Sequence, residues 1–165
     1  MDPLNDDSRT PQGTMLLRTL AMPADTNPSG DIFGGWLMAQ MDLAGAILAY
    51  ELARGRVVTV AVDAIVFHRP VSVGNVVSCF GRCINVGHSS LKIKLEVWAE
   101  HVLDEPIGKR YCVTEAAFTY VAVGKDGHPR DVPRTGNPGV EAVLAALATK
   151  TPAPVDDSDT LPKPA

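Results

Sequence analysis

The organisation of this chain follows from residues 25–51, which read DTNPSGDIFGGWLMAQMDLAGAILAYE. A loop of turn-forming residues leads through a Gly-Gly pair into residues 35–53, where apolar side chains recur at steps of three or four, the spacing of an α-helix. Because these side chains lie on every side, we expect the helix to be buried. It carries one acid, Asp42, and an ionised carboxylate is rarely buried without a partner because it loses its hydration. Asp42 is therefore the first candidate functional residue.

Five other segments have the composition of β-strands. The clearest alternation falls in residues 89–102, which predicts a sheet with one buried face and one wetter face. The connections between the later segments are short, which favours antiparallel pairing. The alternating residues are Leu91, Ile93, Leu95, Val97 and Ala99 on the buried face, and Lys92, Lys94, Glu96, Trp98 and Glu100 on the wetter face. The predicted strands are 13–22, 57–67, 75–86, 89–102 and 107–123.

The order of these elements predicts a particular α+β architecture. One strand precedes the buried helix, and four long antiparallel strands follow it. We therefore expect the hotdog fold, in which an antiparallel five-stranded sheet is wrapped around a long central helix. One sheet leaves part of such a helix uncovered, so we expect the chain to form at least a dimer.

The two ends of the chain differ in composition from this central region. Residues 1–12 are polar and acidic, and we expect them to be disordered. Residues 13–133 are expected to form the folded domain. Seven of the 13 prolines lie at position 129 or later, so residues 134–165 are predicted to be a Pro-rich tail with a short helix at about 139–150.

Composition and charge exclude several classes of function. The net charge of −4 lacks the excess of positive charge that is typical of nucleic-acid-binding proteins. The longest apolar stretch is interrupted by Gln40 and Asp42 and is too short to span a bilayer, and the N-terminus does not read as a signal peptide. We therefore expect a cytoplasmic protein with no membrane partner. The three cysteines and four histidines lack the spacing of disulfide or metal sites, so neither a metal nor a cofactor is predicted.

Several motifs resemble those of the acyl-CoA thioesterases of the YciA type, over roughly residues 14–133. One departure is Asn75, where the family pattern has Asp; the position reads as a turn residue, so nothing catalytic is put in doubt. The matching motifs are Asp25-Thr26-Asn27, GDIFGGW at 30–36, Met41-Asp42, SVGNV at 72–76, GHSS at 87–90, EVW at 96–98 and EPIGKRYCV at 105–113. Together they are far more specific than a Gly-Gly pair alone.

The resemblance implies a hotdog-fold enzyme of lipid metabolism that hydrolyses acyl-CoA thioesters to CoA and a free acid. CoA is then substrate and product, and no cofactor is implied. The assembly implied is a homohexamer, a trimer of dimers in which the dimer is the smallest active unit. Each site would take its carboxylate from one protomer and its Asn loop from the other.

The resemblance also assigns roles near the helix start. A thioester carbonyl gains negative charge when attacked, and the first turn of a helix offers unpaired amides to such a charge. We assign this contact to Gly34 and Gly35, with Gly35 favoured. Asp42 would act as a general base on water, which we slightly favour, or as a nucleophile. Asn27 would orient the water or the carbonyl, although an Asn-Pro-Ser-Gly loop would use Asn in any turn.

The phosphates of CoA require cations or amides. The candidate residues for this role are His68, Arg69, Gly87, His88, Ser89, Ser90, Lys109 and Arg110. Two other functions stay open. A hotdog dehydratase needs a histidine beside its acid, and residues 25–51 contain none. A regulatory domain that binds CoA or acyl-CoA without catalysis would have no need of Asp42.

Overall fold

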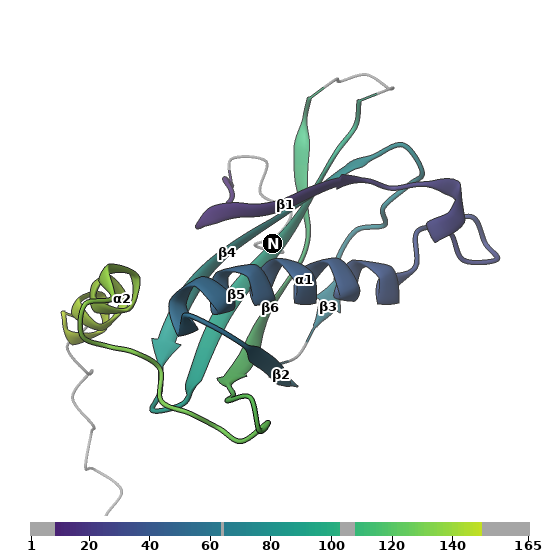
Figure 1. Ribbon diagram of the computed structural model, residues 1–165. Helices are drawn as coiled ribbons and strands as arrows, with labels where there is room; N and C mark the ends of the chain where they lie inside the picture. Colours follow the sequence, from purple (N-terminus) through teal and green to yellow (C-terminus); the bar gives the residue numbers. More distant parts are fainter. Residues whose placement is uncertain (1–8, 64, 103–107, 150–165) are drawn as a thin grey trace, which may run out of the picture.

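The computed structural model describes residues 9–63, 65–102 and 108–149, which form one antiparallel sheet with a long helix, α1, against one face (Figure 1). Helix α1 spans Gly34–Ala53, which confirms the helix predicted at 35–53. A short 3₁₀ turn, η2 (Pro23–Asp25), lies before it, and helix α2 (Pro138–Ala148) follows the sheet. The strands are β1 (Thr14–Leu20), β2 (Val57–Val62), β3 (Val66–Phe67), β4 (Val76–Val86), β5 (Ser90–Glu100) and β6 (Arg110–Ala122).

The sheet has six strands where five were predicted. Its order is β1-β4-β5-β6-β2, and β3 also pairs with β6. The extra strand arises because the predicted strand 57–67 is two strands. The pairing of β2 with β6 ends at Val62–Phe118, and β3 resumes it at Val66–Glu115 with the register changed by one residue. Short connections between β4, β5 and β6 keep these neighbours antiparallel, as predicted.

The core lies between α1 and the inner face of the sheet. Leu91, Ile93, Leu95 and Val97 of the central strand β5 are fully buried, as the alternation predicted. Met41 of α1 is fully buried on the facing side. Burying an apolar side chain of this size contributes about 1.5–3 kcal/mol relative to leaving it exposed, so this layer holds the helix on the sheet.

The opposite side of α1 is apolar but uncovered within one chain. Met38, Leu43, Ile47 and Tyr50 are each more than 40% exposed. The neighbouring strands β2 and β3 add exposed valines and a phenylalanine to the same apolar region: Val58, Val60, Val62, Val66 and Phe67. A contiguous apolar surface of this kind marks an interaction site.

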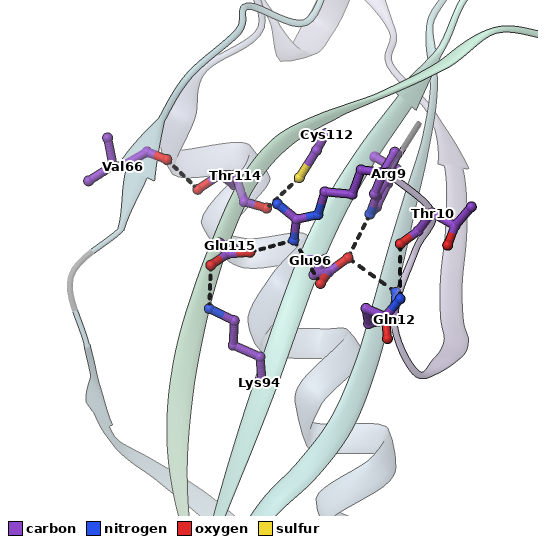
Figure 2. Close-up of polar contacts among 10 residues, drawn as sticks. Arg9, Thr10, Gln12, Val66, Lys94, Glu96, Cys112, Thr114 and Glu115 are labelled. Atoms are coloured by element: carbon purple, nitrogen blue, oxygen red, sulfur yellow. Dashed lines mark hydrogen bonds and ion pairs between the residues drawn. The ribbon is translucent and has the colours of Figure 1, made fainter. Parts of the chain in front are cut away.

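Side chains on the outer face of the sheet are less exposed to solvent than the alternation predicted. Glu96 and Trp98, expected on a wetter face, are 2% and 3% exposed. The segment that precedes β1 covers them (Figure 2). The Glu96 carboxylate accepts hydrogen bonds from Arg9 Nη2 at 2.9 Å, from Trp98 Nε1 at 2.9 Å and from the Gln12 amide at 3.2 Å. Residues 9–12 therefore make specific contacts with the sheet, whereas residues 1–8 of the expected disordered segment lie outside the described residues.

Arg9 joins two strands of this outer face. Its guanidinium bonds Glu96 of β5 and, at 2.5 Å, Glu115 of β6. Glu115 also accepts from Lys94 at 2.7 Å. Burial by itself would raise the pKa of the Glu115 carboxyl, but the hydrogen bonds from Lys94 and Arg9 outweigh it and hold that pKa below its usual value.

Helix α2 is tied to the end of α1. Asn137 caps it by accepting from the Val140 amide, and its side-chain nitrogen donates to Leu52 O at 2.8 Å. The expected tail beyond this helix, residues 150–165, lies outside the described residues. None of the helices in the described part of the chain is long and apolar enough to cross a membrane.

The Arg9 contacts predict a pH-dependent contribution to stability. Replacing Arg9 with Ala should lower the free energy of unfolding by about 2 kcal/mol near pH 7, because Glu96 stays buried without its cation. The Glu115 carboxyl, whose pKa is lowered in the folded state, stabilises the fold above its unfolded pKa, and this contribution is lost as the pH falls through the folded pKa. The difference between wild type and R9A should therefore narrow when urea titrations are carried out at acid pH instead of neutral pH.

The matched control is Arg82→Ala, which removes an exposed arginine of β4. We expect it to change the free energy of unfolding by less than about 0.5 kcal/mol at either pH. Equal stability of R9A and wild type at neutral pH would contradict the role given to Arg9.

Candidate active site

Asp42 lies on α1 where the helix meets β2 and β6, and it is partly exposed. Thr59 of β2 donates its hydroxyl to Asp42 Oδ1 at 2.6 Å. Tyr120 of β6 places its hydroxyl 3.1 Å from the Asp42 backbone oxygen and 3.4 Å from Oδ1. The carboxylate is thus held by two hydroxyl donors and still reaches solvent, which suits a group that acts on a bound molecule.

Gly45 allows this close approach of the helix to β6. A Cβ at this position would overlap the Tyr120 hydroxyl and would lie 2.9 Å from Cζ of the same ring and 3.0 Å from Leu95 Cδ1. The face of α1 around Asp42 is therefore closely packed against β6. Burial raises the pKa of Tyr120 well above its usual value, and the charge of Asp42 adds to this. Tyr120 therefore stays protonated and acts as a donor.

The start of α1 presents backbone amides. The residue before the helix, Phe33, makes no side-chain cap, and the first turn holds no acid. The first helical hydrogen bond runs from the Leu37 amide to Phe33 O at 3.2 Å, so the amides of Gly34 and Gly35 precede it. The space where a Gly35 Cβ would stand is open, with nothing within 4 Å. These amides can meet an oxygen that carries negative charge.

Asn27 organises the loop before the helix. Its Oδ1 accepts from the amides of Ser29 at 2.9 Å and Asp31 at 3.1 Å, and its backbone amide donates to Asp31 O at 2.7 Å. This use of the oxygen fixes the side-chain amide, so the nitrogen Nδ2 is the part of Asn27 that can donate to another molecule. The structure gives Asn27 a turn role in addition to any role towards substrate.

The candidates do not meet around one point within a single chain. Gly35 and Asp42 are seven residues apart on one helix, so they are separated by about 10 Å along its axis. Asn27 is bonded within its own loop and makes none of the described contacts to Asp42. One chain therefore presents the carboxylate in one place and the amides and Asn27 in another.

The candidate phosphate ligands form two groups at opposite ends of β5. Gly87, His88, Ser89 and Ser90 lie at its start, whereas Arg110 pairs with Glu100 at its end. Eleven residues of strand put these ends about 30 Å apart.

The first group is largely bonded to the protein. The Gly87 amide donates to Ser90 O at 2.8 Å, and His88 lies 2.9 Å from Asp131 at the surface. In the second group, Arg110 Nε donates to Glu100 at 3.1 Å.

Arg69, also in the second group, stands over the ring of Tyr111 at 5.5 Å. It borders a cavity of about 280 Å³ with Pro70, Ser72, His101 and Tyr111. His68 follows β3, and its backbone amide donates to Val113 O at 2.9 Å. Lys109 directly precedes Arg110 and β6.

Sequence reasoning missed three polar residues near these groups. Thr59 is the one hydroxyl in the valine-rich β2, and Tyr120 follows Ala116 and Phe118 on the inner face of β6. Asn75, read as a turn residue, is 4% exposed. It accepts from the Ser72 amide at 3.0 Å and from the Tyr111 hydroxyl at 3.1 Å. Thr59 could have been found from the sequence, because it is a lone polar residue in an apolar strand. The sequence held no comparable signal for the burial of Asn75.

No cluster of three or more His, Cys, Asp or Glu side chains that could hold a metal ion is found in residues 9–63, 65–102 and 108–149. The three cysteines are free thiols. Burial raises the pKa of Cys79 to about 12 and those of Cys83 and Cys112 to about 11, so none is poised as a nucleophile.

Comparisons with known proteins identify the fold and the family. Residues 29–104 match the family model described as "Thioesterase superfamily". The crystal structure of HI0827, a hexameric broad specificity acyl-coenzyme A thioesterase, has a TM-score of 0.81 and 58% identity, and the match covers 87% of this chain and 97% of that one. The sheet around a long helix is therefore the hotdog fold, as predicted, and the protein is of the thioesterase class.

Two curated relatives narrow this class. An uncharacterized acyl-CoA thioester hydrolase of Haemophilus influenzae is 58% identical over 142 residues, which is 86% of this chain and 92% of the relative. The acyl-CoA thioester hydrolase YciA of Escherichia coli is 62% identical over 123 residues, 74% of this chain and 93% of the relative. The chain belongs to the YciA-type acyl-CoA thioester hydrolase family.

The Asn27 contacts predict a difference between two substitutions. Asn27→Ala removes the acceptor for two loop amides and should lower the free energy of unfolding by about 1 kcal/mol. Asn27→Asp keeps an oxygen in the same place and should lose clearly less. Thermal unfolding followed by circular dichroism measures both, and equal losses would contradict the turn role of Oδ1.

Proposed function

We propose that this protein hydrolyses acyl-CoA thioesters to CoA and a free carboxylic acid, with Asp42 as the essential acid. The observation that carries this proposal is the Asp42 carboxylate, held by Thr59 at 2.6 Å and Tyr120 at 3.4 Å while remaining partly exposed. Its partial exposure leaves the carboxylate accessible to a bound substrate. The family membership supports the same chemistry.

In the favoured mechanism, Asp42 is a general base. It takes a proton from a water molecule as the water oxygen bonds to the thioester carbon. The carbonyl oxygen gains negative charge, which the amide of Gly35, or that of Gly34, stabilises. When the C=O bond re-forms, the C–S bond breaks, and the proton passes from Asp42 to the CoA thiolate. The products are CoA and the acid.

In the alternative mechanism, Asp42 itself attacks the thioester carbon. The CoA thiolate leaves and takes up a proton, and a mixed anhydride with the protein remains. Water then hydrolyses this anhydride and restores the carboxylate. Both mechanisms require the same amides for the carbonyl oxygen and the same ionised Asp42, so the geometry supports both.

We further propose that each site is shared between two protomers. The separation of about 10 Å between Gly35 and Asp42 of one helix is too large for both to contact one thioester group. A second protomer that covers the exposed side of α1 and the edge strands β2 and β3 would bring its own helix start to Asp42. The dimer would then be the smallest active unit. HI0827 is described as hexameric, which supports a trimer of dimers.

For the CoA phosphates we favour the group formed by His68, Arg69, Lys109 and Arg110. It lies at the end of the sheet where the Ile32 amide bonds Val71 O, close to the start of α1. Arg69 is favoured within the group because its guanidinium borders a cavity and can pair with phosphate oxygens. The turn from Gly87 to Ser90 would contribute amides from another protomer.

Free cysteines support a cytoplasmic location.

Two other functions are less well supported. A thioester dehydratase pairs its acid with a histidine, but the hydrogen bonds to Asp42 in the described residues come from Thr59 and Tyr120. A CoA-binding regulatory domain would not require an acid held by two hydroxyls beside an open helix start.

The direct test of the proposal is Asp42→Asn. Asparagine keeps an oxygen for the Thr59 and Tyr120 hydroxyls, so the fold should survive, but it can neither take a proton nor attack. Turnover of acyl-CoA, followed by release of free thiol over a panel of short to long acyl chains, should fall by about a thousandfold. Binding of CoA should persist.

Asp126→Asn is a matched control, because Asp126 is an exposed acid in a surface turn far along the chain. It should leave turnover unchanged. Near-normal hydrolysis by D42N would overturn the proposed mechanism.

The shared site predicts recovery of activity in mixed oligomers. Chains carrying Asn27→Asp and chains carrying Asp42→Asn should each be inactive alone. A dimer of one chain of each kind contains one site with both native residues, so random mixing should restore about a quarter of the wild-type sites. Native mass spectrometry establishes that the hybrids form. Hybrids without activity would contradict the shared site, and full activity of N27D alone would contradict the role of Asn27.

A further inference from the structure

The hydroxyl of Tyr120 is a buried polar group that the proposed reaction does not use. Tyr120 is fully buried on the inner face of β6. Its hydroxyl lies 3.1 Å from the backbone oxygen of Asp42 and 3.4 Å from Oδ1 of the same residue. Both acceptors therefore belong to the one residue that the reaction requires.

The surroundings of this hydroxyl are built to admit it. Gly45 stands one helical turn after Asp42 on the same face of α1, and any larger residue would place a Cβ on the hydroxyl. Leu95 of β5 closes the space from the other side, because its Cδ1 would lie 3.0 Å from that Cβ. Glycine inside a helix costs about 1 kcal/mol relative to alanine. The chain accepts this cost at a position where a Cβ would overlap the Tyr120 hydroxyl.

The hydroxyl can act only as a donor towards Asp42. Burial raises its pKa, and the negative charge of Asp42 raises it further, so it keeps its proton. Thr59 donates to the same Oδ1 from β2. Hydroxyls from two strands therefore contact the carboxylate, and together they set its orientation on the helix.

We propose that Tyr120 is a positioning residue, whose hydroxyl, in the space left by Gly45, holds the Asp42 carboxylate in the orientation from which it acts on the thioester. The proposal rests on the function proposed above. Tyr120 touches Asp42 and not the substrate, so it works through the carboxylate. Asparagine at position 42 tests the reaction, whereas changes at 120 and 45 test the positioning.

Positioning by a donor has a measurable consequence. Without the hydroxyl, the carboxylate samples other orientations, so the rate of the chemical step falls while substrate binding changes little. A purely structural tyrosine would instead lower thermal stability without this split between kcat and KM.

The experiment replaces Tyr120 with Phe in the full-length oligomer. We expect kcat to fall about tenfold, the size expected for one hydrogen bond to a charged group, with KM within about twofold of wild type. Thr114→Val is the matched control, because it removes a fully buried hydroxyl of the same strand, which donates to Val66 O, and it should leave kcat and KM unchanged.

Gly45→Ala provides a second route, in case the Phe variant loses stability. The added methyl displaces the hydroxyl without removing it, so this variant should show the same fall in kcat with little change in KM. In the Y120F background, the same alanine should have a smaller effect on kcat, since the contact it disturbs is already gone. Thermal melts of each variant report stability separately.

The outcomes separate the two proposals. A wild-type kcat in Y120F would overturn the positioning role and leave the hydrolysis by Asp42 intact. Loss of stability in both variants without a fall in kcat would also overturn it, because a purely structural tyrosine would behave in that way. Near-normal turnover of D42N would instead remove the function on which the proposal rests.

Discussion

The packing of α1 against the inner faces of β5 and β6 is the contact on which the rest of this structure depends. It buries Met41 and the row of apolar residues along β5. It also brings the helix so close to β6 that position 45 must be glycine. Because the helix is held at that distance, an acid one turn before Gly45 comes within reach of hydroxyls from β2 and β6. The core thus sets the position of the carboxylate.

The same packing leaves the other side of the helix uncovered. Its exposed methionine, leucine, isoleucine and tyrosine side chains form an apolar surface together with the valines of β2. Exposing such a surface to water is unfavourable in free energy. The separation between the helix start and Asp42 follows from the geometry of one straight helix. Burial and chemistry therefore both support the proposed second copy, which would cover the helix and bring its own amides to the carboxylate.

The outer face of the sheet follows a different principle. Its centre holds a buried carboxylate, Glu96, which is tolerable because Arg9, Gln12 and Trp98 all donate to it. The chain before β1 is thereby bound across β5 and β6 (Figure 2). Alternation along β5 could predict which residues face outward. It could not predict that a segment more than 80 positions away would cover two of them.

Local pattern was sufficient for the helix and for most of the strands, and together with the family motifs it made Asp42, Asn27 and the Gly-Gly pair the candidates. These features depend on periodicity and on motifs that lie close together in the chain. The split of 57–67 into β2 and β3 was not predictable in this way, because it comes from a change of register against β6. The burial of Asn75 was missed for a similar reason, since its partners Ser72 and Tyr111 meet only after the strands pair.

The order of elements, the apolar helix and the single acid within it can all be read from the chain itself, because each is a property of neighbouring residues. The groups that contact that acid cannot be read from neighbouring residues. Thr59 and Tyr120 are 17 and 78 positions from Asp42, and only the folded sheet brings their hydroxyls to one oxygen atom. Hydrogen bonds act over about 3 Å, so contacts between distant segments depend on how the helix packs against the sheet.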